Sequence, residues 1–226
     1  MKKELIIFLG SPGSGKGTQA NMLKEEFDYY PLSTGQLLRD EGKKDTEEAK
    51  EINRLINAGL LVSDELILDI AFKEIEKVEN QTIILDGYPR TLKQAELAQQ
   101  IIDKNLDKFI LKKVFIFDLE ETALIYRIRN RVTCDKCGKV YNLITKKPEK
   151  VGVCDACGGK LMNRVDDSEI DSILKRNRIY KTNIPDIISF YEKNNLTFLI
   201  DSVKDLKSIN QEIKNVLKIT NNKSEV

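Results

Sequence analysis

The sequence has no histidine among its 226 residues, and it has only four cysteines. Without an imidazole the chain cannot use Ser-His-Asp or Cys-His nucleophile chemistry, and it cannot build a histidine-ligated metal centre. Any reaction that this protein catalyses must therefore proceed without histidine as its general base.

Neither sign of charge is in large excess, and long apolar runs are missing. The 37 Lys and Arg against 36 Asp and Glu give a net charge of +1, which argues against a dedicated nucleic-acid-binding protein. No apolar run approaches the length of a membrane span, and Met1–Leu5 leads directly into a strand pattern. We therefore expect no membrane segment and no secretory signal, and we expect a cytoplasmic protein.

Buried strands are predicted where apolar, β-branched residues follow one another. The strongest runs are Leu5–Leu9, Thr82–Leu85, Val114–Phe117 and Thr197–Ile200, with a weaker one at Tyr29–Leu32. Between these runs lie segments with apolar residues at helical spacing, as from Ile67 to Val78. Apolar strands that alternate with helices predict an α/β fold, a parallel sheet covered on both faces.

Two segments interrupt this alternation. Residues 39–59 are charged and helical in character, but they do not fit the strand-helix rhythm. Residues 130–166 are rich in glycine and lysine and contain all four cysteines. Both segments are predicted to be insertions on the α/β core.

A glycine-rich segment, Gly10–Gln19, follows the first predicted strand and precedes a helical pattern. It reads G-x-x-x-x-G-K, whose glycines let backbone N–H groups surround phosphate oxygens while Lys16 adds a positive charge. The alternative, a plain glycine-rich turn, does not account for the lysine in this context. Gly17 stands where many such loops carry a magnesium-binding Ser or Thr, and Thr18 follows one position later.

This segment and three others resemble, in this order, the adenylate kinase family of nucleoside monophosphate kinases. The four segments are Gly10–Gln19, Ser33–Arg39, Gly59–Leu66 and Asp86–Arg90 with Gln94. The resemblance covers the whole chain and implies a P-loop core with a parallel five-stranded sheet flanked by helices. It implies core segments at 1–32, 63–127 and 168–226, a helical AMP-binding insertion at 33–62, and a zinc-ribbon-like lid at 128–167.

The resemblance further implies the reversible, Mg²⁺-assisted in-line transfer ATP + AMP = 2 ADP, carried out by a monomer. Nucleotide-binding positions carried over from the family are Gly13, Ser14, Gly15, Lys16, Gly17, Thr18, Thr34, Arg39, Val62, Gly87, Gln94 and Val203. The catalytic positions, which also bind nucleotide, are Lys16, Arg90, Arg127, Arg131, Arg164 and Arg176.

Arginines suit this chemistry because the acceptor phosphate is already anionic and requires no general base. A planar guanidinium binds phosphate through two parallel hydrogen bonds, which lysine cannot do. Arg39 and Arg90 are assigned to the acceptor phosphate. The donor phosphates and the charge of the transition state are assigned to Arg127, Arg131, Arg164 and Arg176. A count without a gap would select Lys175 instead of Arg176, but Arg176 keeps the family's spacing to Tyr180.

Three further positions, Asp86, Gln94 and Gln36, are compared with the family pattern one by one. Asp86 ends a predicted strand, where it resembles the aspartate that orders water around Mg²⁺; alternatively it caps the next turn. Gln94 is expected to contact the adenine of AMP or, alternatively, to face solvent. Gln36 replaces the acidic residue that is usual at its place in the family.

The cysteines form two C-x-x-C pairs, separated by sixteen residues. Cys134 and Cys137 form the first pair, and Cys154 and Cys157 form the second. This spacing is typical of a zinc ribbon, and four thiolates leave no open coordination position, so a structural Zn²⁺ is expected. Reduced core cysteines do not explain the paired spacing, and disulfides are disfavoured in a reducing compartment.

Three competing interpretations remain at this stage. The first is a UMP or CMP kinase, against which the long lid and Thr34 argue. The second is a kinase that uses GTP as donor, since contacts to the donor base near Val203 and Lys204 are difficult to read. The third is a zinc-ribbon nucleic-acid-binding module joined to a degenerate nucleotide switch, which the near-neutral charge argues against.

Overall fold

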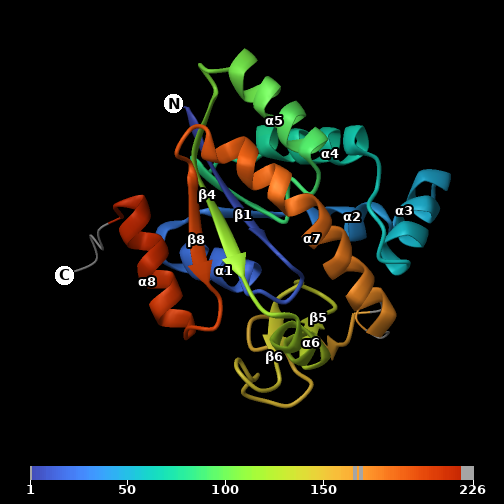
Figure 1. Ribbon diagram of the computed structural model, residues 1–226. Coiled ribbons are helices and arrows are strands. Elements are labelled where there is room, and N and C mark those ends of the chain that lie inside the picture. Colours follow the sequence, from blue (N-terminus) through green and yellow to red (C-terminus); the bar gives the residue numbers. More distant parts are fainter. Residues whose placement is uncertain (1, 165–166, 168–169, 220–226) are drawn as a thin grey trace.

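The structure is a computed structural model that describes residues 2–164, 167 and 170–219. At its centre lies a five-stranded parallel sheet in the order β2-β3-β1-β4-β8 (Figure 1). Its strands are β1 (Lys3–Gly10), β2 (Tyr30–Ser33), β3 (Thr82–Asp86), β4 (Phe109–Asp118) and β8 (Thr197–Asp201). The predicted five-stranded parallel sheet is confirmed, including the weakest strand.

One strand is longer than the sequence pattern predicted. β4 begins at Phe109 rather than Val114, and in this first half exposed Ile110 and Lys112 alternate with buried Phe109 and Leu111. Only the second half is continuously buried. A search for unbroken apolar runs therefore detects only the part of the strand that is covered on both faces.

Helices cover both faces of the sheet. α1 (Lys16–Phe27) and α8 (Leu206–Leu217) pack on one face, and α4 (Asp64–Lys77), α5 (Leu92–Lys104) and α7 (Ile170–Glu192) pack on the other. β1 contributes to both cores by alternation: Leu5 and Ile7 belong to the α4–α5–α7 side, and Ile6 and Phe8 to the α1–α8 side. This two-sided burial fixes the central strand and the loop that follows it.

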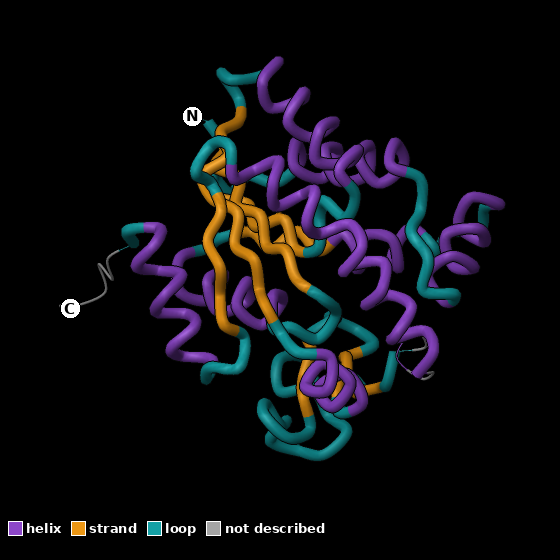
Figure 2. The backbone as a smooth tube through the Cα atoms, in the orientation of Figure 1, coloured by secondary structure: helices purple, strands orange, loops and turns teal. Residues whose placement is uncertain are grey.

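The two segments that break the alternation lie outside these layers. The first contains α2 (Thr34–Glu41) and α3 (Glu47–Asn57), between β2 and α4. The second follows α6 (Glu121–Arg129) and contains a small antiparallel sheet of β5 (Arg131–Cys134), β6 (Val140–Asn142) and β7 (Leu161–Met162). Figure 2 shows that most of this second segment is loop, near the carboxyl ends of the central strands.

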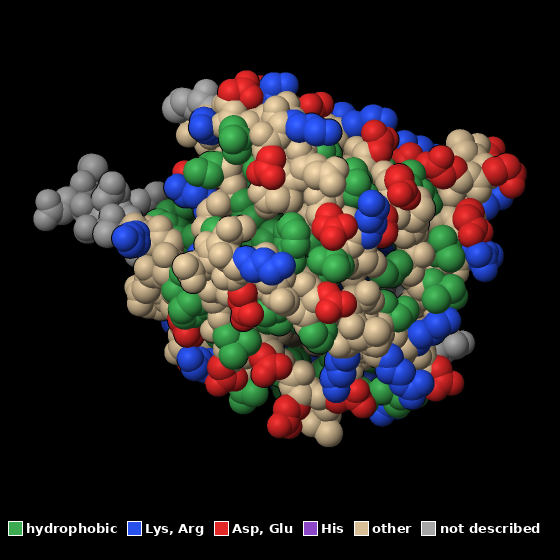
Figure 3. Space-filling model, turned by 45° about the horizontal axis from the view of Figure 1, so that its top comes forward, with side chains coloured by type: hydrophobic (Ala, Val, Ile, Leu, Met, Phe, Trp, Pro, Cys, Tyr) green, Lys and Arg blue, Asp and Glu red, His purple; other side chains and the backbone are tan. Residues whose placement is uncertain are grey.

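The surface carries charges of both signs without a dominant patch on the face in Figure 3. Among the described residues, none of the helices combines the length and the apolar character needed to cross a bilayer. The long helix α7 contains charged residues throughout and packs on the sheet instead.

Candidate active site

A cavity of about 990 Å³ lies at the carboxyl end of the parallel strands, where ligands of such sheets bind. Its wall contains residues from the loop after β1, from α2, from the β3–α5 connection and from the β5–β7 segment. Nearly all of the residues proposed from the sequence line it: Gly13, Gly15, Lys16, Gly17, Thr18, Thr34, Arg39, Val62, Asp86, Gly87, Arg90, Gln94, Arg127, Arg131, Arg164, Arg176 and Val203. Among the proposed nucleotide-binding and magnesium positions Ser14 is the exception, because it is buried with its hydroxyl near Lys16.

The loop after β1 presents the amino end of α1 to this cavity. Gly13 and Gly15 have φ angles of 85° and 98°, which favour glycine, and a Cβ on Gly13 would lie 2.8 Å from the side chain of Ile128. α1 starts at Lys16, and no side chain caps its amino end. The uncapped N–H groups and the positive end of the helix dipole are suited to an anion.

Lys16 points back across the loop. Its Nζ donates hydrogen bonds to the carbonyl oxygens of Gly10 at 2.7 Å and Ser11 at 3.0 Å. Burial lowers the pKa of Lys16 to about 8; Asp86 acts in the opposite direction, and the charges of Arg90 and Arg131 lower the pKa further. The buried lysine thus lies near one carboxylate and two guanidinium groups, and an anionic ligand would stabilise its charged form.

The pKa of Lys16 gives the first testable prediction, a pH dependence of triphosphate binding. A bound phosphate favours the charged lysine, so it raises a pKa that starts at about 8 in the free protein. Affinity should therefore be constant below pH 8 and decrease above it, by at most about tenfold per pH unit, because binding then requires proton uptake. Calorimetry with a non-hydrolysable ATP analogue from pH 7 to 9.5 measures this slope.

The control for this slope is Lys16→Met, which cannot take up the proton. The variant should bind weakly, with an affinity that does not change between pH 7 and 9.5. An unchanged affinity of the wild type above pH 8 would contradict the assignment of the titration to Lys16.

Asp86 lies beside the phosphate loop. It ends β3, paired in register with Phe8 of β1 and Ser33 of β2. A Cβ on Gly17 would lie 3.1 Å from the Asp86 carboxylate, closer than most real contacts. Gly17 therefore leaves room for the Asp86 carboxylate. A carboxylate oxygen is the kind of group that binds Mg²⁺ or its bound waters.

Two arginines converge on the backbone of α2. A Cβ on Gly35 would lie 3.4 Å from a terminal nitrogen of Arg39 and 3.6 Å from one of Arg90. The missing side chain leaves a space between the two guanidinium groups. Arg90 is also anchored by its Nε, which donates to the Gly87 carbonyl at 2.8 Å, and Thr34 donates to the same carbonyl at 3.1 Å. The space is suited to a phosphate with two bidentate partners.

Gln94 is buried and held at both ends of its amide. Its oxygen accepts the backbone N–H of Arg90 at 2.7 Å, and its nitrogen donates to Asp64 at 2.8 Å. The alternative in which Gln94 faces solvent is wrong. Its contact with a base stays a prediction, and Asp64, which the sequence pattern did not single out, helps to orient it.

Asp167, a buried carboxylate, joins two of the proposed arginines. Arg131 donates two hydrogen bonds to its carboxylate, both at 2.7 Å, and Arg176 donates one at 2.8 Å. Burial opposes ionisation of Asp167, but the two guanidinium groups outweigh it and hold the pKa of this carboxyl below its usual value. Asp167 was not among the proposed site residues, although its place shortly after Arg164 was the available signal.

The remaining two proposed arginines, Arg127 and Arg164, donate hydrogen bonds to neighbouring segments. Arg127 donates to the carbonyl of Ser202 at 2.8 Å, which links α6 to the loop that contains Val203. Arg164 donates to the hydroxyl of Thr133 at 2.9 Å. These contacts place both guanidinium groups at the cavity wall.

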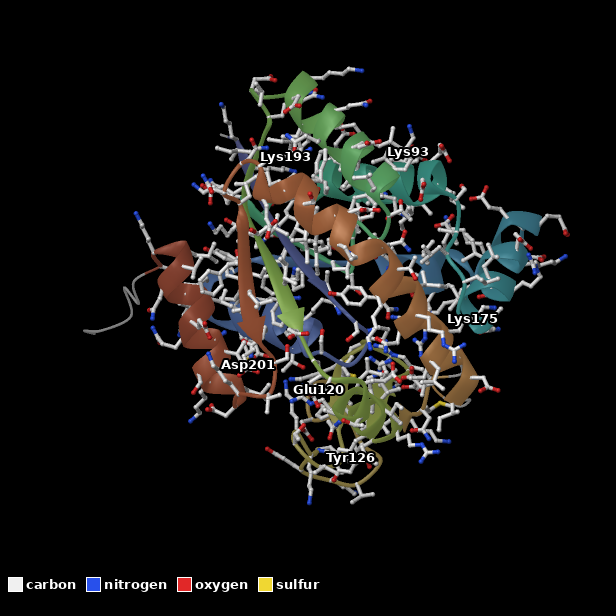
Figure 4. The ribbon with its side chains drawn as sticks, viewed as in Figure 1. Lys93, Glu120, Tyr126, Lys175, Lys193 and Asp201 are labelled. Atoms are coloured by element: carbon white, nitrogen blue, oxygen red, sulfur yellow. The ribbon has the colours of Figure 1, made fainter. Side chains whose placement is uncertain are left out.

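The structure distinguishes the two candidates on α7. Arg176 lines the cavity, whereas Lys175 is exposed on the surface (Figure 4). One helical position, about 100°, separates them, so only one of the two can face the cavity.

A sequence model of the adenylate kinase family matches residues 8–196. The chain belongs to this family. Adenylate kinase of Petrotoga mobilis is 41% identical over 216 residues, which cover 96% of this chain and 98% of the relative. Those of Thermosipho melanesiensis and Archaeoglobus fulgidus are each 38% identical, with 94% of this chain covered and 99% and 97% of the relatives. The adenylate kinase resemblance expected from the sequence is thus confirmed.

The four cysteines of this adenylate kinase family member form one cluster in the β5–β7 segment. The Sγ atoms of Cys134, Cys137, Cys154 and Cys157 all lie within 4.8 Å of one another. Two of these separations join one pair to the other, 3.4 Å from Cys134 to Cys157 and 3.6 Å from Cys137 to Cys154. A tetrahedral zinc site with Zn–S bonds of about 2.3 Å has sulfurs about 3.8 Å apart, so the cluster fits this ion.

Glycines shape both turns of the cluster. Gly138 and Gly158 follow the second cysteine of each pair with φ angles of 70° and 69°, and their N–H groups donate to the carbonyls of Cys134 and Cys154. Apart from the cysteines, the apolar core of this segment consists of Val132 and Tyr141 with Leu161 against them. Such a small core is typical of a segment that a metal stabilises.

Proposed function

We propose that this protein catalyses the reversible reaction ATP + AMP = 2 ADP. The observation that carries the proposal is one cavity that is lined by two groups of residues, each suited to an anion. The uncapped amino end of α1 with Lys16 forms the donor site, and the space between Arg39 and Arg90 forms the acceptor site. Such an arrangement aligns a donor phosphate with an acceptor phosphate for in-line transfer.

Each group then has a defined task. Lys16 and the N–H groups of the loop hold the donor phosphates, and Arg39 and Arg90 hold the phosphate of AMP. The four arginines Arg127, Arg131, Arg164 and Arg176 stabilise the charge on the transferred group. Asp167 keeps two of these guanidinium groups oriented.

Mg²⁺ bound to the donor phosphates would supply further neutralisation of charge. Asp86 is the residue that would hold it, through water, since its carboxylate lies against the phosphate loop at Gly17. The acceptor phosphate is anionic at neutral pH, so the chain requires no general base for the transfer.

We propose that the insertions at 33–62 and 128–167 close over AMP and ATP. Two contacts support this role: Gly138 lies against Gln36 of α2, and Lys139 lies 3.8 Å from Glu25 of α1. Closure excludes water, which would otherwise compete as acceptor. A single chain contains both proposed anion sites, so a monomer would suffice for the transfer.

A coupled assay for ADP tests the proposed function against its alternatives. ATP with AMP should give rapid ADP formation, whereas UMP or CMP as acceptor and GTP as donor should react far more slowly. Faster turnover with UMP, CMP or GTP would reassign the substrate. No turnover with any pair would contradict the phosphotransferase itself.

We also propose that Cys134, Cys137, Cys154 and Cys157 bind one structural Zn²⁺. The mutual proximity of their sulfurs, all within 4.8 Å of one another, supports it, as does the small apolar core around them. Four protein ligands leave no coordination position for a substrate, so the ion would hold the segment together rather than take part in the transfer.

Removal of this ion gives the second prediction. One Zn²⁺ per chain should copurify, and its removal by a chelator should lower the midpoint of thermal unfolding by at least about 5 °C, since 1 kcal/mol corresponds to about 2–4 °C for a chain of this size. Elemental analysis and calorimetry measure both quantities, with zinc-saturated chelator as the control. Cys154→Ser should lose the metal. A metal-free wild type, purified under reducing conditions, would contradict the zinc site.

A further inference from the structure

The hydroxyl of Tyr141 lies at the proposed zinc cluster. Tyr141 belongs to β6, is 2% exposed, and packs with Val132, Cys134 and Cys154. Its oxygen lies 3.4 Å from Cys154 Sγ. The same oxygen accepts the backbone N–H of Asp155 at 2.9 Å. The phenol group therefore has contacts on two sides, one with a donor and one with a sulfur.

The direction of the phenol proton follows from these two contacts. The N–H of Asp155 can only donate, so it occupies a lone pair of the Tyr141 oxygen. A zinc-bound cysteine is a thiolate and carries no proton, so Cys154 Sγ can only accept. The phenol proton is thus available to the sulfur, and the contact is an O–H···S⁻ hydrogen bond.

Cys154 needs donors from the protein more than its exposed counterparts do. Four thiolates around Zn²⁺ give a net charge of −2, and hydrogen bonds to the sulfurs offset part of it. Cys137 and Cys157 are exposed, so water can donate to them, but Cys154 is only 2% exposed. The N–H groups of Ala156 and Cys157 donate to its sulfur, and the hydroxyl of Tyr141 adds a side-chain donor.

We propose that Tyr141 is a positioning residue of the zinc site, which raises the affinity for Zn²⁺ by donating a hydrogen bond to the Cys154 thiolate. The inference rests on the proposed zinc site. Groups of this kind, which contact a ligand rather than the metal, typically change metal affinity by about 10- to 100-fold.

The test compares Tyr141→Phe with Tyr126→Phe. Both substitutions remove one phenol hydroxyl, but Tyr126 is 57% exposed on α6 and does not belong to the cluster. Competition with a chromophoric chelator under reducing conditions measures the zinc dissociation constant. Tyr141→Phe should raise it by about tenfold or more, and Tyr126→Phe should leave it unchanged.

A spectroscopic measurement separates this role from packing. In the cobalt-substituted protein, loss of the hydrogen bond to Cys154 should shift the thiolate-to-metal charge-transfer band in Tyr141→Phe only. Tyr141→Phe should also lower the unfolding midpoint of the zinc-bound chain more than that of the metal-free chain. Turnover would not distinguish an effect on zinc from an effect on the nucleotide, because Tyr141 also borders the cavity.

Any one of four outcomes would overturn the inference. An unchanged zinc dissociation constant, or an unchanged cobalt band, in Tyr141→Phe would show that the hydroxyl does not act on the metal. Equal losses of stability with and without zinc would assign Tyr141 to packing alone. A wild type without stoichiometric zinc would refute the zinc site as well, whereas the other three results would leave that site intact.

Discussion

Replacing Lys16 by methionine is expected to lower turnover by about 10²- to 10³-fold, the usual effect of removing one preorganised charge that stabilises a transition state. Nζ of Lys16 has carbonyl oxygens and a hydroxyl as its partners in the free protein, and it lies among the charges of Asp86, Arg90 and Arg131. Methionine fills similar space without the charge, so the fold should be retained. Steady-state kinetics of ADP formation and the thermal unfolding midpoint measure the two effects.

The matched control is Lys93→Met. Lys93 is exposed on α5 and does not line the cavity. Figure 4 shows where Lys93 lies on the molecule. The control should retain full turnover. Near-normal turnover of Lys16→Met, with a normal unfolding midpoint, would contradict the role of the phosphate loop in the transfer.

Arg90→Ala is expected to lower turnover by roughly 10²-fold or more and to raise KM for AMP. Its guanidinium borders the space above Gly35 that it shares with Arg39, and the Gly87 carbonyl holds its Nε in place. Removal of the side chain leaves the acceptor phosphate with one guanidinium instead of two. KM for ATP should change less than KM for AMP, because Arg90 borders the space at Gly35 and is held by Gly87, whereas the donor phosphates are assigned to the loop at Lys16.

One further variant separates the geometry of the Arg90 side chain from its charge, and a second variant is a control. Arg90→Lys keeps the charge but loses the bidentate fork, so it should recover only a small part of the lost turnover. Arg178→Ala removes an exposed arginine of α7 that does not line the cavity, and it should behave as the wild type. A rise in KM for ATP alone in Arg90→Ala would place Arg90 on the donor side.

The sequence by itself determined the class of the fold and the phosphate loop. Buried parallel strands require continuous apolar residues, so the strand runs were visible in the sequence, and a phosphate loop requires glycines and a lysine at fixed spacing. The paired cysteines were visible for the same reason, since one turn brings the two sulfurs of each pair together. These features depend on residues that are close in the chain.

Only the tertiary structure decided which distant groups meet. Asp167 holds Arg131 and Arg176 from two different segments, and Asp64 on α4 orients Gln94 on α5. The sequence favoured Arg176 over Lys175 by its spacing to Tyr180, and only the packing of α7 shows that Arg176 lines the cavity. A carboxylate far along the chain carries no periodic signal, because its partner is set by how helices pack rather than by local spacing. The fold class is therefore a property of local patterns, whereas the ion pairs of the site are a property of the packed chain.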